Sequence, residues 1–108
     1  MGIKFKGLDK LEARLSSLAD PEAIRTVVKK NGSDLQKKAQ RKAPYKTGNL
    51  RRSIQLQFSG DGMTATVEPT AQYAPYVEYG TRFMKAQPYL RPAYEEQKIQ
   101  FLEDLKKL

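Results

Sequence analysis

Few residues in this chain could carry chemistry. Its 108 residues include no cysteine and no histidine, which removes thiolate nucleophiles, thiolate metal sites and the most common general base. The remaining acid–base candidate is Glu78, within the tyrosine-rich segment YAPYVEYGT (73–81). A buried carboxylate among tyrosines could have a raised pKa. Because no second carboxylate or base accompanies it, we expect a structural salt bridge to Arg82 or Arg91. We predict no enzymatic activity, no cofactor and no metal.

The segment that follows is typical of binding rather than catalysis. In PYLRPA, Pro88 and Pro92 bracket Tyr89 and Arg91. Proline stiffens a segment before a partner arrives, which lowers the ordering cost of binding, and tyrosine and arginine are frequent interface anchors. The pattern therefore predicts a docking surface. The alternative, that these residues only fix the start of the last helix, stays open.

The charge is concentrated in the first half of the chain. The net charge is +8, and residues 1–52 alone hold 14 Lys and Arg against 5 Asp and Glu. A basic half of this kind is found in nucleic-acid-binding modules, and also on solvated lysine-rich helix faces. A basic set next to Tyr45 suits phosphates and stacked bases: Arg41, Lys42, Lys46, Arg51 and Arg52. No helix-turn-helix, RRM or zinc pattern accompanies it, so nucleic-acid binding is the alternative function.

Helical periodicity indicates the elements that must position these residues. Leucines at steps of 3, 4 and 3 predict a short helix over residues 8–18. Asp20 and Pro21 are a typical helix start, so a second helix should begin at about residue 21. It should end before Pro44, with a bend or break at Gly32. A third helix is expected over residues 91–108, with Pro92 in its first turn. Its apolar face would be Tyr94, Phe101, Leu105 and Leu108, with Ile99 and Leu102 alongside.

Two segments alternate as half-buried strands do. Residues 54–58 and 63–69 each place apolar side chains at every second position. The intervening SGDG (59–62) predicts a hairpin turn. The expected fold class is α+β, with about three helices packed on one face of a small, mainly antiparallel β-sheet. Residues 1–108 should form a single domain.

Three segments together resemble one protein family. APYKTGNLRRSI (43–54), YAPYVEYGT (73–81) and QPYLRPA (87–93) are similar to the signature segments of the gp-ten-like proteins of tailed bacteriophages. These are neck or tail-completion proteins, often described as minor tail components. The resemblance implies a virion structural protein at the head–tail junction, present in the host bacterial cytoplasm during assembly. It also implies a closed ring of subunits and no enzymatic activity.

The resemblance and the residue types together predict the surface. Tyr73, Tyr76, Glu78, Tyr79 and Arg91 should form a compact core cluster. Its exposed edge, with residues 47–52 and 82–87, should meet neighbours. The protein-interface candidates are Thr47, Leu50, Arg51, Arg52, Tyr76, Arg82, Phe83, Tyr89 and Arg91. The structural positions are Pro44, Gly48, Tyr73, Glu78, Gly80, Thr81, Pro88 and Pro92.

The expected partners are macromolecular. They are other copies in the assembled particle, with a monomer when free, and other phage head-completion and tail proteins, with incidental contact to packaged DNA. A membrane or a small-molecule substrate is not expected.

Overall fold

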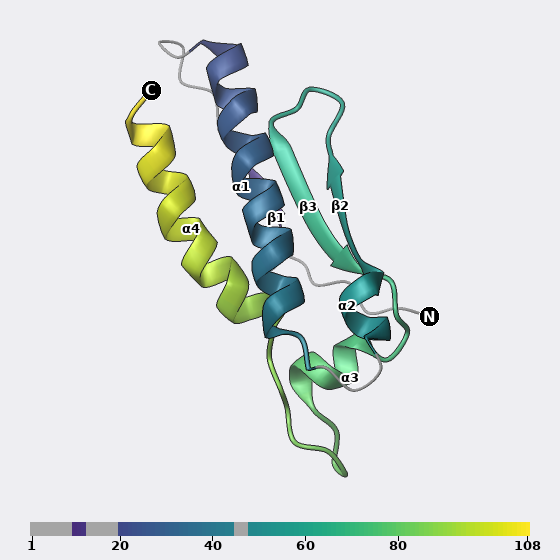
Figure 1. Ribbon diagram of the computed structural model, residues 1–108. Helices are drawn as coiled ribbons and strands as arrows, with labels where there is room; N and C mark the ends of the chain where they lie inside the picture. The colour runs from purple at the N-terminus through teal and green to yellow at the C-terminus, as the bar shows by residue number, and fades with distance from the viewer. Residues whose placement is uncertain (1–9, 13–19, 45–47) are drawn as a thin grey trace.

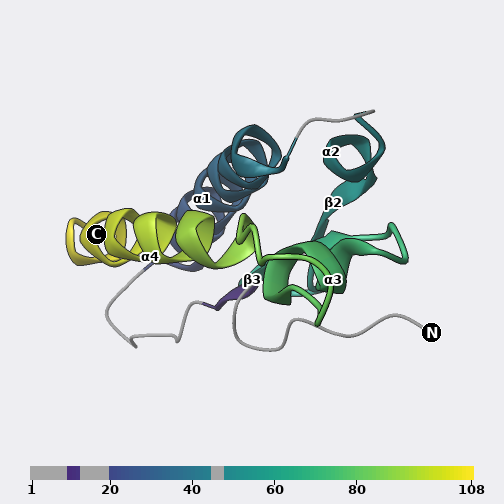
Figure 2. The same cartoon turned by 90° about the horizontal axis from the view of Figure 1, so that it is seen from below.

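One long helix, α1, lies between a second long helix and a small sheet (Figures 1 and 2). The computed structural model describes residues 10–12, 20–44 and 48–108. In chain order the elements are β1 (Lys10–Glu12), α1 (Pro21–Lys42), α2 (Asn49–Ser53), β2 (Ile54–Phe58), β3 (Thr64–Pro69), α3 (Ala74–Tyr79) and α4 (Leu90–Lys106). The predicted α+β class is confirmed. Within the described ranges, no helix is both long and apolar enough to cross a membrane.

The sheet is antiparallel, and its described strands lie in the order β1-β3-β2. The predicted hairpin is confirmed, with Leu56 opposite Val67 and Phe58 opposite Ala65. Since alternate residues of a strand point to opposite faces, Ala65 and Val67 share one face, and both are fully buried. Phe58, at the end of its strand, is 43% exposed.

The hairpin turn predicted at the SGDG segment is closed by side-chain hydrogen bonds. The Asp61 carboxylate accepts a hydrogen bond from the Ser59 hydroxyl and another from the Met63 N–H at 3.0 Å. These bonds, the Ser59 one first, hold the pKa of Asp61 below its ordinary value. The turn therefore supplies its own polar partners at the exposed end of the sheet.

The first expected helix is wrong where the structure describes it. Residues 10–12 form β1, which pairs with β3 and sets Leu11 opposite Ala65. The rest of the predicted helix over 8–18 lies outside the described residues. Leu11 is 2% exposed, so the apolar side chain read as part of a helical stripe is buried beside the sheet's central strand. Pairing with β3 outweighs the local helical periodicity.

α1 begins and ends where its sequence indicates. The Asp20 carboxylate accepts a hydrogen bond from the Glu22 N–H at 3.0 Å, and Pro21 occupies the first turn. The helix ends at Lys42, and Ala43 is extended because Pro44 follows it. A buried stripe faces the core: Ile24, Val28, Leu35 and Ala39.

The alternative of a break at Gly32 is wrong, because α1 runs through it without interruption. Gly32 is buried, and a Cβ placed there would lie 2.7 Å from the Ala65 Cβ and 3.2 Å from Leu56 Cδ1. The absent side chain lets the helix axis approach the sheet closely. Glycine at this position allows close packing of the helix against the sheet. This packing offsets the lower helix propensity of glycine.

Substitution of Gly32 by alanine should destabilise the fold despite alanine's better helix propensity. The propensity gain is about 1 kcal/mol, whereas overpacking against the Ala65 methyl should cost about 1–3 kcal/mol. We expect a net loss of up to about 2 kcal/mol in the free energy of unfolding, measured by urea denaturation. Gly60→Ala is the matched control, since nothing lies within 4 Å of its added Cβ. A Gly32→Ala protein more stable than the parent would contradict this account of the packing.

α4 is confirmed, but its buried face differs from the predicted one. Leu90, Ala93, Gln97 and Phe101 are buried. Tyr94 and Leu105 are only half-buried. Three residues assigned to or beside the apolar face are exposed: Ile99 (65%), Leu102 (46%) and Leu108 (51%). The buried side of α4 makes a polar contact with α1, and the spacing of apolar residues does not predict such a contact.

That contact joins α1 and α4 through side-chain amides. The Asn31 Nδ2 donates to the Asp104 carboxylate at 3.0 Å, and the Gln97 Nε2 donates to the Asn31 Oδ1. Gln100 Nε2 donates to the other Asp104 oxygen at 2.7 Å, and Lys30 Nζ lies 3.7 Å from the carboxylate. The Asn31 hydrogen bond first, then that of Gln100, lowers the pKa of Asp104 although partial desolvation raises it. Asn31 and Gln97 are fully buried, so this is the polar tie between the two long helices.

Because Asp104 belongs to this polar tie, the stability of the fold should depend on pH in the acid range. A carboxyl whose folded-state pKa is depressed stabilises the fold above its unfolded pKa, about 3.9, and this stabilisation is lost as the pH falls through the folded pKa. We therefore expect the parent to be more stable than Asp104→Asn at neutral pH. The difference should shrink steadily below about pH 4. Urea denaturation of both proteins across this range measures it, and a difference independent of pH would contradict the assignment.

Candidate functional site

The tyrosine-rich segment forms part of one end of the molecule, together with α2 and the loop over residues 80–88 (Figures 1 and 2). Residues 74–79 form the short helix α3, which the sequence analysis did not predict. Pro75 in its first turn and Gly80 at its end are the local signals that could have revealed it. The C-terminal end of α1 and the N-terminal end of α4 border this region.

Glu78 of α3 is the structural centre of this end. Its side chain is buried, and its Oε1 accepts hydrogen bonds from the N–H groups of Tyr89 at 3.0 Å and Leu90 at 2.9 Å. Its Oε2 accepts one from the Arg91 N–H at 3.3 Å. These are the leading N–H groups of α4, and Pro92 next in the chain has none. A negative charge at a helix N-terminus also interacts favourably with the helix dipole. Glu78 thus caps α4 from a different helix.

The expected salt bridge of Glu78 to Arg82 or Arg91 is therefore wrong. Arg91 pairs with Glu95 at 3.3 Å on the exposed side of α4, and the Arg82 guanidinium lies 5.1 Å from the centre of the Phe83 ring. Backbone N–H groups satisfy the carboxylate without desolvating a second charged side chain. A carboxylate engaged in this way has no obvious access to a substrate.

The loop between α3 and α4 is closed by its own hydrogen bonds. Gly80 has φ of 78°, and a Cβ there would lie 2.8 Å from the Ala86 nitrogen, so only glycine fits. The Thr81 N–H donates to the Met84 carbonyl at 2.8 Å, and the Gln87 N–H donates to the Val77 carbonyl at 2.8 Å. Gly80 and Thr81, both nominated as structural positions, stand at the start of this loop. Phe83, within this loop, is 88% exposed.

The predicted core cluster is wrong for its tyrosines. Tyr73 is 43% exposed, Tyr76 is 52% exposed and Tyr79 is 53% exposed. Arg91 is also exposed, so of the expected cluster Glu78 alone is buried. The six-residue helix α3 presents its buried side through Ala74, Pro75 and Glu78, which leaves the tyrosines on its outer side.

Tyr89, by contrast, is fully buried and does not offer a surface contact. It stands at the start of α4, where its own N–H is bonded to Glu78. Burial raises the pKa of its hydroxyl well above the ordinary value, and the Glu78 charge raises it further. Tyr89 is therefore a core residue of the α3–α4 junction, although the sequence nominated it for the interface.

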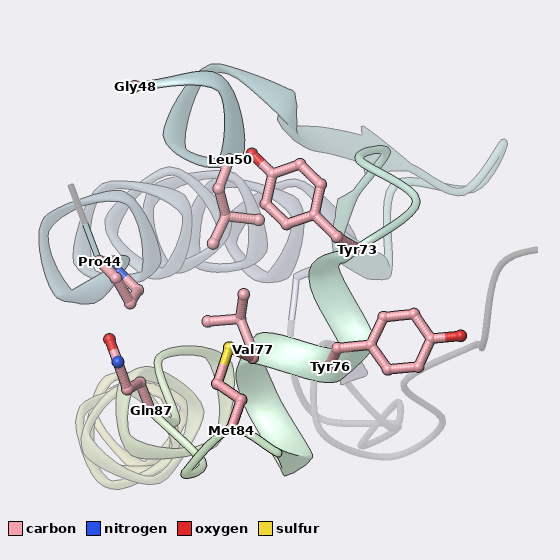
Figure 3. Close-up of a pocket in the computed structure, with 8 residues that line it drawn as sticks. All are labelled: Pro44, Gly48, Leu50, Tyr73, Tyr76, Val77, Met84 and Gln87. Atoms are coloured by element: carbon pink, nitrogen blue, oxygen red, sulfur yellow. The ribbon is translucent and has the colours of Figure 1, made fainter. Parts of the chain in front are cut away.

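An apolar cavity of about 210 Å³ lies between α2, α3 and the loop. Leu50 reaches it from α2, Val77 from α3 and Met84 from the loop, and these side chains point toward one another (Figure 3). The remaining lining residues are Pro44, Gly48, Tyr73, Tyr76 and Gln87. Met84 and Gln87 belong to the edge predicted at residues 82–87, whereas Val77 was not among the predicted site residues, because pairing α2 with α3 requires the tertiary structure.

The other nominated residues are divided between this cavity and the surface. Leu50 is buried at the cavity, Arg51 is half-buried, and Arg52 is exposed with its guanidinium donating to Asn49 Oδ1 at 2.7 Å. Thr47 lies outside the described residues. Pro88 is exposed and Pro92 is half-buried. Among the residues with described positions, no group of His, Cys, Asp or Glu is arranged to hold a metal ion.

The model of one protein family matches residues 9–80, two thirds of the chain. Its description is "Bacteriophage HK97-gp10, putative tail-component". The chain belongs to this family. The match includes the segment 43–54 and all but the last residue of the segment 73–81, both of which carried the resemblance, and it ends before the segment 87–93. No curated protein and no solved structure matches the chain.

Membership of the HK97-gp10-like family confirms the predicted relationship to phage tail proteins. It describes a bacteriophage tail component, a virion part that works with other phage proteins. For such a component, the exposed end at α2, α3 and the loop 80–88 is the candidate site. This end combines a rigid loop, exposed aromatic side chains and an apolar cavity.

The Glu78 cap should contribute strongly to stability. In Glu78→Gln the amide oxygen can still accept two N–H bonds, but the amide nitrogen then faces the Arg91 N–H, and the charge is lost. We expect a loss of about 2–3 kcal/mol in the free energy of unfolding, measured by urea denaturation. Glu95→Gln removes a carboxylate from an exposed ion pair and should cost less than about 1 kcal/mol. Equal effects of the two variants would show that the cap is unimportant.

Proposed function

We propose that this tail component is a structural subunit of the head–tail junction, a neck or tail-completion protein that acts by protein–protein contacts and not by catalysis. Family membership and the resemblance of its three sequence segments support the proposal. The observation that carries it is the loop over residues 80–88. Phe83 in this loop is 88% exposed, so its ring does not stabilise the isolated subunit. Aromatic side chains are, however, frequent anchors of interfaces.

The rigidity of this loop supports a docking role. Its backbone hydrogen bonds and the cap at Glu78 fix the loop before a partner arrives. An ordered loop pays less entropy on binding than a flexible one. Arg82 over the Phe83 ring adds a second residue type that is enriched at interfaces.

In the assembled particle the subunit would form a closed ring. A ring requires two different patches on each subunit, and the described surface offers two. One is the end that contains Tyr76 and Phe83, and the other is the exposed pair Ile99 and Leu102 on α4. Ile99 lies nine residues along α4 from its start, roughly 14 Å at the helical rise. The two patches are thus separated on the molecule.

DNA is a weaker candidate as the main partner. Two of the basic side chains of α1 take part in its contact with α4, since Lys42 pairs with Glu96 at 2.6 Å and Lys30 lies near Asp104. Contacts to packaged DNA would then be incidental. A protein that neutralises several phosphates should lose orders of magnitude in DNA affinity from low to moderate salt.

Phe83→Asp in the phage that encodes the chain should block assembly without unfolding the subunit. As a surface substitution it should change the free energy of unfolding by less than about 0.5 kcal/mol. Loss of an interface anchor should reduce the yield of infectious particles by about tenfold or more, with unjoined heads and tails visible by electron microscopy.

Leu108→Asp is the matched control, because it places the same charge on an exposed apolar residue at the far end of α4. It should leave the particle yield unchanged. Normal particles from the Phe83→Asp phage, with the variant chain incorporated, would refute the docking role of the loop.

A further inference from the structure

The size and lining of the end cavity indicate the kind of group it accepts. Its volume of about 210 Å³ is smaller than the roughly 300–1,000 Å³ of pockets for drug-sized ligands. Leu50, Val77 and Met84 give it an apolar interior. A cavity of this size and polarity suits one large apolar side chain of another polypeptide, the usual anchor of a protein interface.

The cavity walls formed by α3 and the loop are held in place by hydrogen bonds within the chain. The Gln87 N–H bonds the Val77 carbonyl across the base of the loop, and Met84 is bonded to Thr81 through both its N–H and its carbonyl. Glu78, one residue after Val77, is fixed to the start of α4. The cavity is therefore preformed, as in most small binding sites.

The charged residues around the cavity indicate the sign of the charge expected of a partner. No aspartate or glutamate occurs between Asp34 and Asp61, and that stretch contributes Arg51 and Arg52 of α2. The loop contributes the exposed residues Arg82 and Lys85. Of the neighbouring carboxylates, Glu78 is buried in its cap, and Glu95 and Glu96 of α4 are paired with Arg91 and Lys42. Glu68 is exposed on β3.

The same charges disfavour a second copy of this chain as the occupant. Two chains of net charge +8 meeting at this end would bring their arginines and lysines together. Like charges across an interface repel and suppress wrong pairings, whereas opposite charges speed the encounter. The ring contact proposed above at this end would then be made by Phe83, which does not line the cavity.

We propose that the end cavity binds an acidic segment of a different phage protein. One aromatic or large aliphatic side chain of the segment occupies the space between Leu50, Val77 and Met84. Its aspartates and glutamates lie against Arg82, Lys85 and the arginines of α2. The inference rests on the proposed function only in taking this end as a protein-binding surface, and it adds the chemistry of the partner.

A random linear peptide library, displayed and selected against the folded full-length chain at low salt, tests the proposal. The enriched peptides should share an aromatic or large aliphatic residue flanked by Asp or Glu. Their affinity, measured by calorimetry on synthetic peptides, should weaken by about tenfold in Met84→Glu and by about fivefold in Lys85→Glu. Lys98→Glu, an exposed charge reversal on α4, is the matched control and should bind like the parent. Circular dichroism of each variant verifies the fold, and Arg82→Glu repeats the charge test if Met84→Glu unfolds.

Four results would overturn the proposal. They are no enrichment, enrichment of basic or wholly polar peptides, peptides whose binding ignores the Met84 and Lys85 variants, and binding of a duplex oligonucleotide in competition with the peptides. Analytical ultracentrifugation adds a further check, because dimerisation abolished by Met84→Glu would assign the cavity to a second copy. These outcomes are separate from the particle yield of the Phe83 variant. A junction subunit can therefore survive the failure of this particular partner assignment.

Discussion

The carboxylate of Glu78, bonded to the first N–H groups of α4, is the constraint on which the functional end depends. It joins α3 to α4 across the loop 80–88, so the ends of that loop cannot separate. A helix of six residues has little stability alone, and α3 is held by this cap and by the packing of Ala74 and Pro75. Without the cap, α3 would have no fixed position, and the wall that Val77 gives to the cavity would be lost.

The cap also explains why so many aromatic side chains remain exposed. The polar centre of the α3–α4 junction is satisfied by backbone groups, so Tyr76 and Tyr79 are not needed as hydrogen-bond partners inside. Tyr89 fills the core instead. In the proposed function, stability and recognition are thereby carried by different residues of one segment. A buried carboxylate and a buried tyrosine hold the scaffold, and the exposed aromatics are available to partners.

Sequence patterns predicted the parts of the fold that depend on neighbours in the chain. The cap at Asp20, the stop at Pro44, the hairpin at residues 59–62 and the start of α4 follow from local backbone chemistry. The patterns failed where distant residues decide. β1 forms because β3 offers a pairing edge, and Glu78 finds its donors 11–13 residues away. The apolar cavity unites Leu50 with Val77 and Met84 from separate segments, which no spacing rule connects.

Two adjacent residues of α1 make contacts with different parts of the core, and these contacts fix the position of α1 relative to this end. Gly32 lets the helix approach the sheet, while Asn31 turns toward α4 and bonds the Asp104 carboxylate. The end of α1 near Pro44 and the start of α4 near Leu90 then have one relative placement, and the cavity lies beside both. Since the cavity exists only when sheet, α1 and α4 are assembled, a partner bound there stabilises the native state alone. The proposed binding at the end and the cohesion of the core would therefore form one linked equilibrium, although the Glu78 cap and the Asn31 tie lie in different parts of the chain.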